Sequence, residues 1–242
     1  MPHSRILLLL VISVLMTLQT ALAETAATPG NPAARVIYLV RHGHYDSDPN
    51  ADPDRGPGIS TLGVVQSRLL GARLARLPFA FERRFVSPMQ RARDTAATLA
   101  GDLGNGRFQV LEDLRECTPT TRRRAQLEGL SEQELADCEA QLEGLYTRHF
   151  RPASGQEQHE LMVCHGNVIR YLITRSLGVD SEAWLEMSVG HTSITRIRIE
   201  ADGSFKLVGA GDVGHLPPRL QTGASGDHEI DLQIPALLLD SP

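Results

Sequence analysis

The chain has 242 residues, 41% of them hydrophobic, with 24 Lys and Arg against 29 Asp and Glu and a formal net charge of -5. A chain of this length can bury a substantial core in one domain, and nothing in its length requires a second one. The lack of an overall basic field argues against a nucleic-acid partner, because proteins that bind nucleic acids generally carry a strongly basic surface.

The first 23 residues are predicted to be a secretory signal peptide rather than part of the fold. A short basic start leads into an apolar run over residues 6–18, and Ala21-Leu22-Ala23 has the small-x-small pattern of a cleavage site. The run is shorter than the roughly 20 apolar residues of a transmembrane helix, although an uncleaved anchor is the alternative. We therefore expect cleavage after Ala23, a periplasmic or secreted protein without stable membrane association, and a linker over residues 24–34.

Two β-branched runs, more than a hundred residues apart, each end in a His-Gly pair. The first, over residues 36–41, leads to His42, and the second, over residues 161–164, leads to His165. Both runs predict buried strands that stop where a loop or a helix begins. In an open α/β sheet the carboxyl ends of the strands carry the active site, so we expect both histidines to lie there.

The other elements follow from apolar spacing, helix caps and turn residues. In chain order the sequence predicts a loop at 45–58, a helix from Ser60 that ends before Pro78, a strand at 85–86, a helix at 89–99, a strand at 108–111, a helix opened by a Ser131/Glu134 capping box, a helix at 167–177, and a hairpin of strands 193–199 and 205–210. The folded domain is expected to cover residues 35–220, followed by a C-terminal tail at 221–242.

The side chains near these strand ends suggest phosphoryl transfer. A neutral imidazole such as that of His42 can attack phosphorus and form a covalent phosphohistidine, which water later hydrolyses. Arg41 and Arg91 can each donate two hydrogen bonds to phosphate oxygens. His165 would stabilise charge on the phosphoryl group in the transition state, and Glu116 is the well-placed carboxyl group for protonating the leaving oxygen.

Three motifs resemble the signatures of the histidine phosphatase superfamily, branch 1, also called phosphoglycerate mutase-like. They are Arg41-His42-Gly43, the Arg91-Ala92-x-x-Thr95 segment and Val163-Cys164-His165-Gly166. The stretches 113–116, 164–171 and 211–218 are most similar to the mitochondrial Ser/Thr phosphatases of the PGAM5 group, and the resemblance covers about residues 35–220. It implies an α/β fold, a three-layer sandwich with a mostly parallel central sheet and helices on both faces.

The same resemblance implies a role for each site residue. His42 is the expected nucleophile, Glu116 the expected proton donor, and the phosphate pocket is expected to contain Arg41, Arg91 and His165. No metal or organic cofactor is implied. The expected activity is the hydrolysis of phosphomonoesters, with phosphoproteins as a hypothesis for the substrate.

Two further residues are candidates for substrate binding. Asn167 is expected to support the phosphate pocket, and His44 is either a phosphate contact or an ordinary solvated histidine. The partner is a phosphorylated substrate, either a small molecule or a phosphoprotein. The glycine that follows His165, where the acid phosphatase and phytase branch has its aspartate proton donor, argues against that branch.

Three other functions are weighed against this one. His42-Gly43-His44-Tyr45-Asp46 also resembles the H-x-H-x-D motif of metal-dependent hydrolases, in which His42, His44 and Asp46 would bind zinc, although the histidine that should follow is Ser47. A non-catalytic phosphate-binding protein could keep the same pocket. A mutase would return the phosphoryl group to its substrate, but the predicted export from the cytosol favours hydrolysis.

The cysteines and the tryptophan leave two questions open. Cys117, Cys138 and Cys164 show no C-x-x-C spacing and are odd in number, so we favour unpaired buried cysteines, with one disulfide as the alternative. Trp184 is expected in the core, whereas an exposed Trp184 would support a homodimer.

Overall fold

The computed structural model describes residues 31–104 and 106–224. The predicted signal peptide, most of the predicted linker and most of the predicted tail therefore lie outside the described residues. None of the helices in residues 31–104 and 106–224 has the combined length and hydropathy that a membrane span requires.

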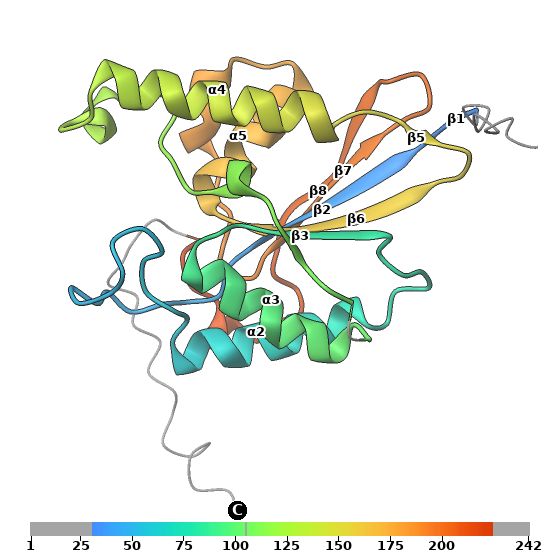
Figure 1. The fold of residues 1–242 in the computed structure, drawn as a ribbon, viewed down its shortest axis with the longest axis horizontal. Helices are drawn as coiled ribbons and strands as arrows, with labels where there is room; N and C mark the ends of the chain where they lie inside the picture. Colours follow the sequence, from blue (N-terminus) through green and yellow to red (C-terminus); the bar gives the residue numbers. More distant parts are fainter. Residues whose placement is uncertain (1–30, 105, 225–242) are drawn as a thin grey trace, which may run out of the picture. The chain divides into compact units, whose positions relative to one another are not determined.

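A six-stranded sheet forms the centre of the domain, in the order β4-β3-β6-β2-β7-β8 (Figure 1). Its strands are β2 (Arg35–Arg41), β3 (Arg83–Val86), β4 (Gln109–Val110), β6 (Gln158–Cys164), β7 (Ile194–Ile199) and β8 (Phe205–Asp212). The strands β4, β3, β6 and β2 run parallel, whereas β7 pairs antiparallel with both β2 and β8. The predicted mostly parallel sheet with a C-terminal hairpin is confirmed.

The domain begins slightly before the predicted boundary. Pro32–Ala33 forms β1, which pairs antiparallel with β5 (Ala153–Ser154). These two segments meet because they precede β2 and β6, which are parallel neighbours in the large sheet. Part of the segment predicted to be a linker is thus hydrogen-bonded structure.

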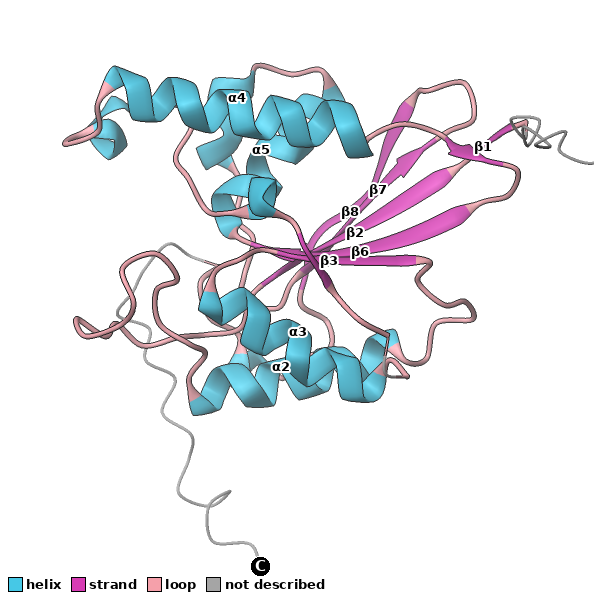
Figure 2. Cartoon of the chain, in the orientation of Figure 1, coloured by secondary structure: helices cyan, strands magenta, loops and turns pink. Residues whose placement is uncertain are grey.

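Helices cover both faces of the sheet (Figure 2). One face carries α2 (Thr61–Leu74) and α3 (Gln90–Asp102), and the other carries α4 (Glu132–His149) and α5 (Gly166–Leu177). The shorter 3-10 helices are η1 (Glu112–Leu114), η2 (Arg124–Leu127), η3 (Ser181–Glu186) and η4 (Pro218–Leu220). The expected three-layer α/β sandwich is therefore confirmed.

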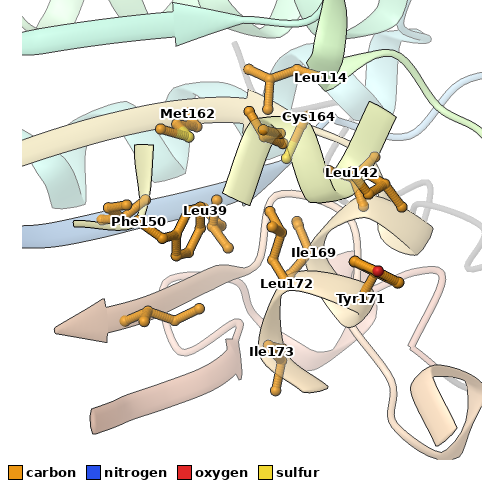
Figure 3. Close-up of a cluster of buried hydrophobic side chains, with 14 of the residues drawn as sticks. Leu39, Leu114, Leu142, Phe150, Met162, Cys164, Ile169, Tyr171, Leu172 and Ile173 are labelled. Atoms are coloured by element: carbon orange, nitrogen blue, oxygen red, sulfur yellow. The ribbon is translucent and has the colours of Figure 1, made fainter. Parts of the chain in front are cut away.

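The two sides of β2 face two separate hydrophobic cores, because side chains alternate across a strand. Ile37 and Leu39 pack with α4 and α5 in one of these cores. Figure 3 shows part of this core. Val36, Tyr38 and Val40 pack against α2 and α3. A strand that is apolar on both faces reads as a continuous hydrophobic run, which is why residues 36–40 predict a buried strand.

Local capping sets where several helices begin and end. The Ser60 hydroxyl accepts a hydrogen bond from the Gly63 N–H at 3.2 Å at the start of α2. The predicted capping box of Ser131 and Glu134 opens α4. Gly178 ends α5 with a positive φ of 64°, a conformation that costs glycine little.

Trp184 lies in η3 and is buried, with 2% of its surface exposed. Its indole Nε1 donates a hydrogen bond to the Thr120 carbonyl at 3.0 Å, which satisfies the polar atom of a buried tryptophan. The prediction that Trp184 belongs to the core is confirmed, so this side chain offers no exposed contact for a homodimer.

A buried carboxylate forms ion pairs that link the amino ends of the central strands. Glu160 of β6 is fully buried, and its Oε1 accepts hydrogen bonds from Arg35 of β2 and Arg83 of β3. Arg35 is itself buried, with 6% exposure. Removing the carboxylate would leave a buried guanidinium without its counter-charge, which costs more than the pair itself contributes.

We predict that Glu160→Gln lowers the free energy of unfolding by about 3 kcal/mol. Urea denaturation at neutral pH measures this change. Glu186→Gln is the matched control, because it removes an acid from an exposed ion pair with Arg123 and should leave stability close to that of the wild type. Equal stability of the two variants would contradict the role given to Glu160.

Candidate active site

Strand pairing brings His42 and His165 together at the carboxyl edge of the sheet. In the parallel register of β2 and β6, Arg41 lies opposite Cys164, so the two histidines follow at the next position. The His42 N–H donates to the Cys164 carbonyl at 2.9 Å, and the two imidazole centroids are 5.1 Å apart. The expectation that two strands far apart in sequence end at the same place agrees with this geometry.

Hydrogen bonds fix the orientation of the His42 ring. Its Nδ1 lies 2.8 Å from the Gly43 carbonyl, which can only accept, so Nδ1 carries the proton. Its Nε2 accepts a hydrogen bond from the Arg91 Nε–H at 3.1 Å. Burial, followed by electrostatic interaction with His165, Arg41 and Arg91, holds the pKa of His42 well below its usual value. The ring is therefore neutral, with a lone pair on Nε2.

Two glycines allow the loop after His42 to approach α2. A Cβ on Gly43 would lie 2.8 Å from the Gly63 carbonyl oxygen, and a Cβ on Gly63 would lie 2.2 Å from the His44 carbonyl oxygen. Neither position has room for a side chain. The Gly43 N–H also donates to Thr95 Oγ1 at 2.9 Å, so α3 helps to hold the same loop.

His165 lies directly before α5 and is fully buried. Its Nε2 hydrogen-bonds to Ser87 Oγ at 2.7 Å, while its Nδ1 has no partner among the described residues. Burial, and then the charges of Arg91 and Arg41, hold its pKa well below the usual value. The imidazole thus adds a directed polar atom to the site without adding a charge.

Arg41 is anchored by carbonyl groups from distant parts of the chain. One guanidinium nitrogen, Nη1, donates to Val189 at 2.7 Å and to Gly223 at 3.0 Å. Its Nε is buried and has no partner in the described structure. Burial lowers the pKa of Arg41 to about 10, and the group still carries its charge at neutral pH. The anchored guanidinium is available to an anion through its Nε–H.

Glu116 belongs to the loop after η1, and its carboxyl group lies at the N-terminus of α5. Its Oε1 accepts a hydrogen bond from the Asn167 N–H at 3.3 Å, and its Oε2 is shielded from solvent without a described partner. Burial raises the pKa of Glu116, and the charges of Arg41 and Arg91 partly oppose this rise. A carboxyl group in such a setting can hold a proton closer to neutral pH than an exposed glutamate can.

Unpartnered polar atoms show what kind of ligand the site accepts. Arg41 Nε, His165 Nδ1, Arg170 Nε and Glu116 Oε2 are all buried without partners among the described residues. Buried polar atoms normally have partners, so their concentration here indicates a place for a ligand. Three guanidinium groups, Arg91 included, against one carboxyl group favour an anion that accepts several hydrogen bonds, such as phosphate.

The side chains of Asn167 and His44 each have a hydrogen-bond partner within the protein. The Asn167 amide nitrogen donates to the Cys117 carbonyl at 3.0 Å, so this side chain holds the loop that carries Glu116. His44 Nδ1 hydrogen-bonds to Ser60 Oγ at 2.8 Å. Within residues 31–104 and 106–224, no three His, Cys, Asp or Glu side chains are grouped to hold a metal ion, and Asp46 is exposed.

Several residues of the site do not stand out in the sequence. His191 lies with its ring centroid 5.4 Å from that of His42, and its Nδ1 hydrogen-bonds to Thr222 at 2.8 Å. Thr192, whose φ is 54°, donates its N–H to the Arg41 carbonyl at 3.1 Å. Ser87 and Thr95 lie within or beside a signature, whereas no sequence signal points to His191 or Thr222.

The interpretation of all three cysteines as unpaired is wrong. Cys117 and Cys138 form a disulfide with their Cα atoms 5.6 Å apart, and Cys164 is buried and free. Spacing could not reveal the pair, because α4 brings Cys138 back to the loop after Glu116 only through tertiary packing. The disulfide attaches that loop to α4 one residue away from the carboxyl group.

A family model supplies the decisive comparison. The model of the histidine phosphatase superfamily, branch 1, matches residues 37–153 and 143–212. The chain belongs to the histidine phosphatase superfamily. The matches span β2 to β8 and thus include every residue placed in the site above except those after residue 212.

Curated members of the superfamily give the same result. The mitochondrial serine/threonine-protein phosphatase Pgam5 of Caenorhabditis elegans is 35% identical over 193 residues, which are 77% of this chain and 66% of the relative. PGAM5 of Xenopus tropicalis is 32% identical, over 77% of this chain and 67% of its own length. This histidine phosphatase chain spans about two thirds of the length of these relatives.

Solved structures support the fold alone. A phosphoglycerate mutase from Plasmodium falciparum has a TM-score of 0.54 and 24% identity, covering 76% of this chain and 95% of its own. A putative alpha-ribazole-5'-P phosphatase from Escherichia coli has a TM-score of 0.56 and 18% identity, covering 74% and 98%. The predicted phosphoglycerate mutase-like fold is confirmed.

The comparisons contradict the predicted periplasmic or secreted location. The relatives that match this histidine phosphatase are named as mitochondrial proteins, in Caenorhabditis briggsae and in Xenopus tropicalis among others. The prediction depended on residues 1–23, which lie outside the described residues. Apolar and basic content at an N-terminus was therefore an insufficient basis for assigning a compartment.

We predict that burial of neutral His42 makes the protein less stable in mild acid. The unfolded chain binds a proton at this residue below about pH 6.5, whereas the folded site does not, so stability is lost as the pH falls. Between pH 7 and pH 5 the wild type should lose about 2 kcal/mol more than His42→Gln, measured by urea denaturation. Parallel pH dependences would contradict a neutral buried His42.

Proposed function

We propose that the chain is a metal-independent phosphatase that hydrolyses phosphomonoesters through a covalent phosphohistidine on His42. The orientation of the His42 ring carries the proposal, because the Gly43 carbonyl leaves Nε2 as the nucleophilic atom. A neutral imidazole is the form that can attack phosphorus, and burial among positive charges favours that form.

In the first step, the substrate phosphate displaces the hydrogen bond between Arg91 and His42. Arg41, Arg91 and His165 bind the phosphoryl oxygens, and the His42 Nε2 lone pair forms a bond to phosphorus while the bond to the leaving oxygen breaks. Glu116 gives its proton to that oxygen. Its raised pKa supports this role, since a general acid must hold its proton until the transition state.

In the second step, water hydrolyses the phosphohistidine. Glu116, now a carboxylate, takes a proton from water as the water oxygen bonds to phosphorus and the bond to Nε2 breaks. Phosphate leaves, and both His42 and Glu116 return to their starting states. The same arginines hold the phosphoryl oxygens in both steps, so the protein needs no rearrangement between them.

We predict that hydrolysis of p-nitrophenyl phosphate survives excess chelator and that His42→Ala lowers kcat/KM by at least about 10³-fold. Acid-labile phosphoenzyme should form on the wild type and not on the variant. His159→Gln is the matched control, because His159 lies at the other end of β6 from His165. Loss of activity with chelator would instead support a metal-dependent hydrolase, and a folded wild type without turnover would support a binding protein.

We further propose that the substrate is a phosphoprotein. The curated relatives are named serine/threonine-protein phosphatases, and they match 77% of this chain. The serine or threonine oxygen that leaves phosphorus is a poor leaving group unless it is protonated, which suits a site with a buried proton donor such as Glu116.

For a phosphoprotein substrate, we predict that kcat/KM for phosphoserine and phosphothreonine peptides exceeds that for p-nitrophenyl phosphate, although the aryl ester is chemically the more reactive. Phosphate release from a small peptide panel measures this. Free phosphoserine is the control for recognition of the peptide backbone. Peptides hydrolysed no faster than the aryl ester would contradict the phosphoprotein proposal and leave the phosphohistidine chemistry intact.

A further inference from the structure

Arg170 is a charged residue beside the site to which the proposed reaction assigns no role. It lies in the second turn of α5, four residues after Gly166, and side chains on a helix lean toward its N-terminus. Its guanidinium accordingly lies over Gly166, where an added Cβ would be 3.0 Å from Nη2. That glycine leaves the space in which the guanidinium reaches the first turn of α5.

The first turn of α5 is also where Glu116 is held. The Asn167 N–H donates to Glu116 Oε1, so the carboxyl group and the Arg170 guanidinium lie beside adjacent residues of the same turn. The Nε of Arg170 is buried and has no hydrogen-bond partner among the described residues, and no ion pair of Arg170 is found within them. This cation is thus close to the carboxyl group that would lose its proton in the proposed reaction.

Trp184 fixes the position of the guanidinium. The guanidinium carbon of Arg170 lies 5.5 Å from the centroid of the Trp184 ring, within range of a cation–π interaction. The Trp184 indole is itself fixed by its hydrogen bond to the Thr120 carbonyl. A preorganised charge costs no rearrangement when charge develops nearby, which is the condition for effective electrostatic assistance.

Arg170 acts electrostatically on fewer groups of the site than Arg41 and Arg91 do. The charges of Arg41 and Arg91 act on His42 and His165 and also on Glu116. Arg170 acts on Glu116, whose pKa it lowers, and on Arg41. Its charge therefore acts on the proposed general acid, together with the charges of Arg41 and Arg91.

We propose that Arg170 is a positioning residue for Glu116, whose guanidinium stabilises the carboxylate formed when Glu116 gives its proton to the leaving group. This inference rests on the proposed function, in which Glu116 is the general acid. The covalent bonds and protons move as in the proposed reaction, and Arg170 gains or loses none. Its contribution is greatest for substrates whose leaving oxygen must receive the proton early.

The groups that face Glu116 come from four elements. They are Arg41 of β2, Arg91 of α3, the Cys164 thiol of β6 and Arg170 of α5. Burial raises the pKa of Cys164 far above neutral, so the thiol stays uncharged. Removing the Arg170 charge should raise the pKa of Glu116, and the alkaline limb of the pH profile, where Glu116 must be protonated, should move to higher pH.

The test compares a series of substituted phenyl phosphates, from p-nitrophenyl to phenyl phosphate, on Arg170→Gln. We expect kcat/KM to fall at least about tenfold for phenyl phosphate and less than about threefold for p-nitrophenyl phosphate, with the alkaline limb at higher pH. Arg170→Lys should restore both properties in large part, because it keeps the charge. If Arg170→Gln fails to fold, Arg170→Met keeps the alkyl stem on Trp184 and serves the same test.

Arg175→Gln is the matched control. Arg175 lies on the same helix, pairs with Glu143 at 2.7 Å and stacks over Tyr146 at 4.6 Å, away from the site residues. It should leave the leaving-group dependence and the pH profile unchanged. An equal loss on all esters with an unmoved pH profile would overturn the inference in favour of a structural role, and an equal rise in KM would assign Arg170 to phosphate binding.

Variants of Glu116 distinguish a failure of the proposed function from a failure of the Arg170 inference. If Glu116→Gln leaves the leaving-group dependence of the wild type unchanged, Glu116 is not the general acid and the proposed function fails at that step. If Glu116→Gln steepens the dependence and Arg170→Gln does not, the Arg170 inference alone fails. In the double variant, Arg170→Gln should add nothing to the steepening, because its effect acts through Glu116.

Discussion

The parallel pairing of β2 with β6 is the constraint on which the site depends. Its register places Arg41 opposite Cys164, and the next residue on each strand is a histidine. A slip of one residue would turn the side chains of one strand to the opposite face and would separate the two imidazoles. The buried Glu160 pairs at the other end of the same strands, so the structure fixes this register at both ends.

The two histidines are uncharged although positively charged arginines lie beside them. Arg41 and Arg91 lower the pKa of both imidazoles, which remain uncharged, while burial of Glu116 favours its protonated form. The site therefore carries the positive charge of its guanidinium groups, and a phosphate dianion would neutralise much of it. The same arrangement makes the nucleophile available and attracts the group that it attacks.

The sequence was sufficient to predict what local patterns encode. Apolar runs located the central strands, the Ser131 capping box located the start of α4, and the signatures around His42, Arg91 and His165 led to residues that the structure brings together. What could not be predicted depends on tertiary packing. The Cys117–Cys138 disulfide, the contact of His191 with His42 and the contact of Arg170 with Trp184 all join segments whose proximity no local pattern shows.

The anchoring of Arg41 affects the order in which the site can be completed. Its guanidinium is held by carbonyl groups 148 and 182 residues further along the chain. A ribosome produces the segment with the nucleophile first and the Gly223 carbonyl almost two hundred residues later. A nascent chain that has already paired β2 with β6 therefore still lacks the support of Arg41, and the anion pocket is complete only after the turn beyond η4 has been synthesised and folded.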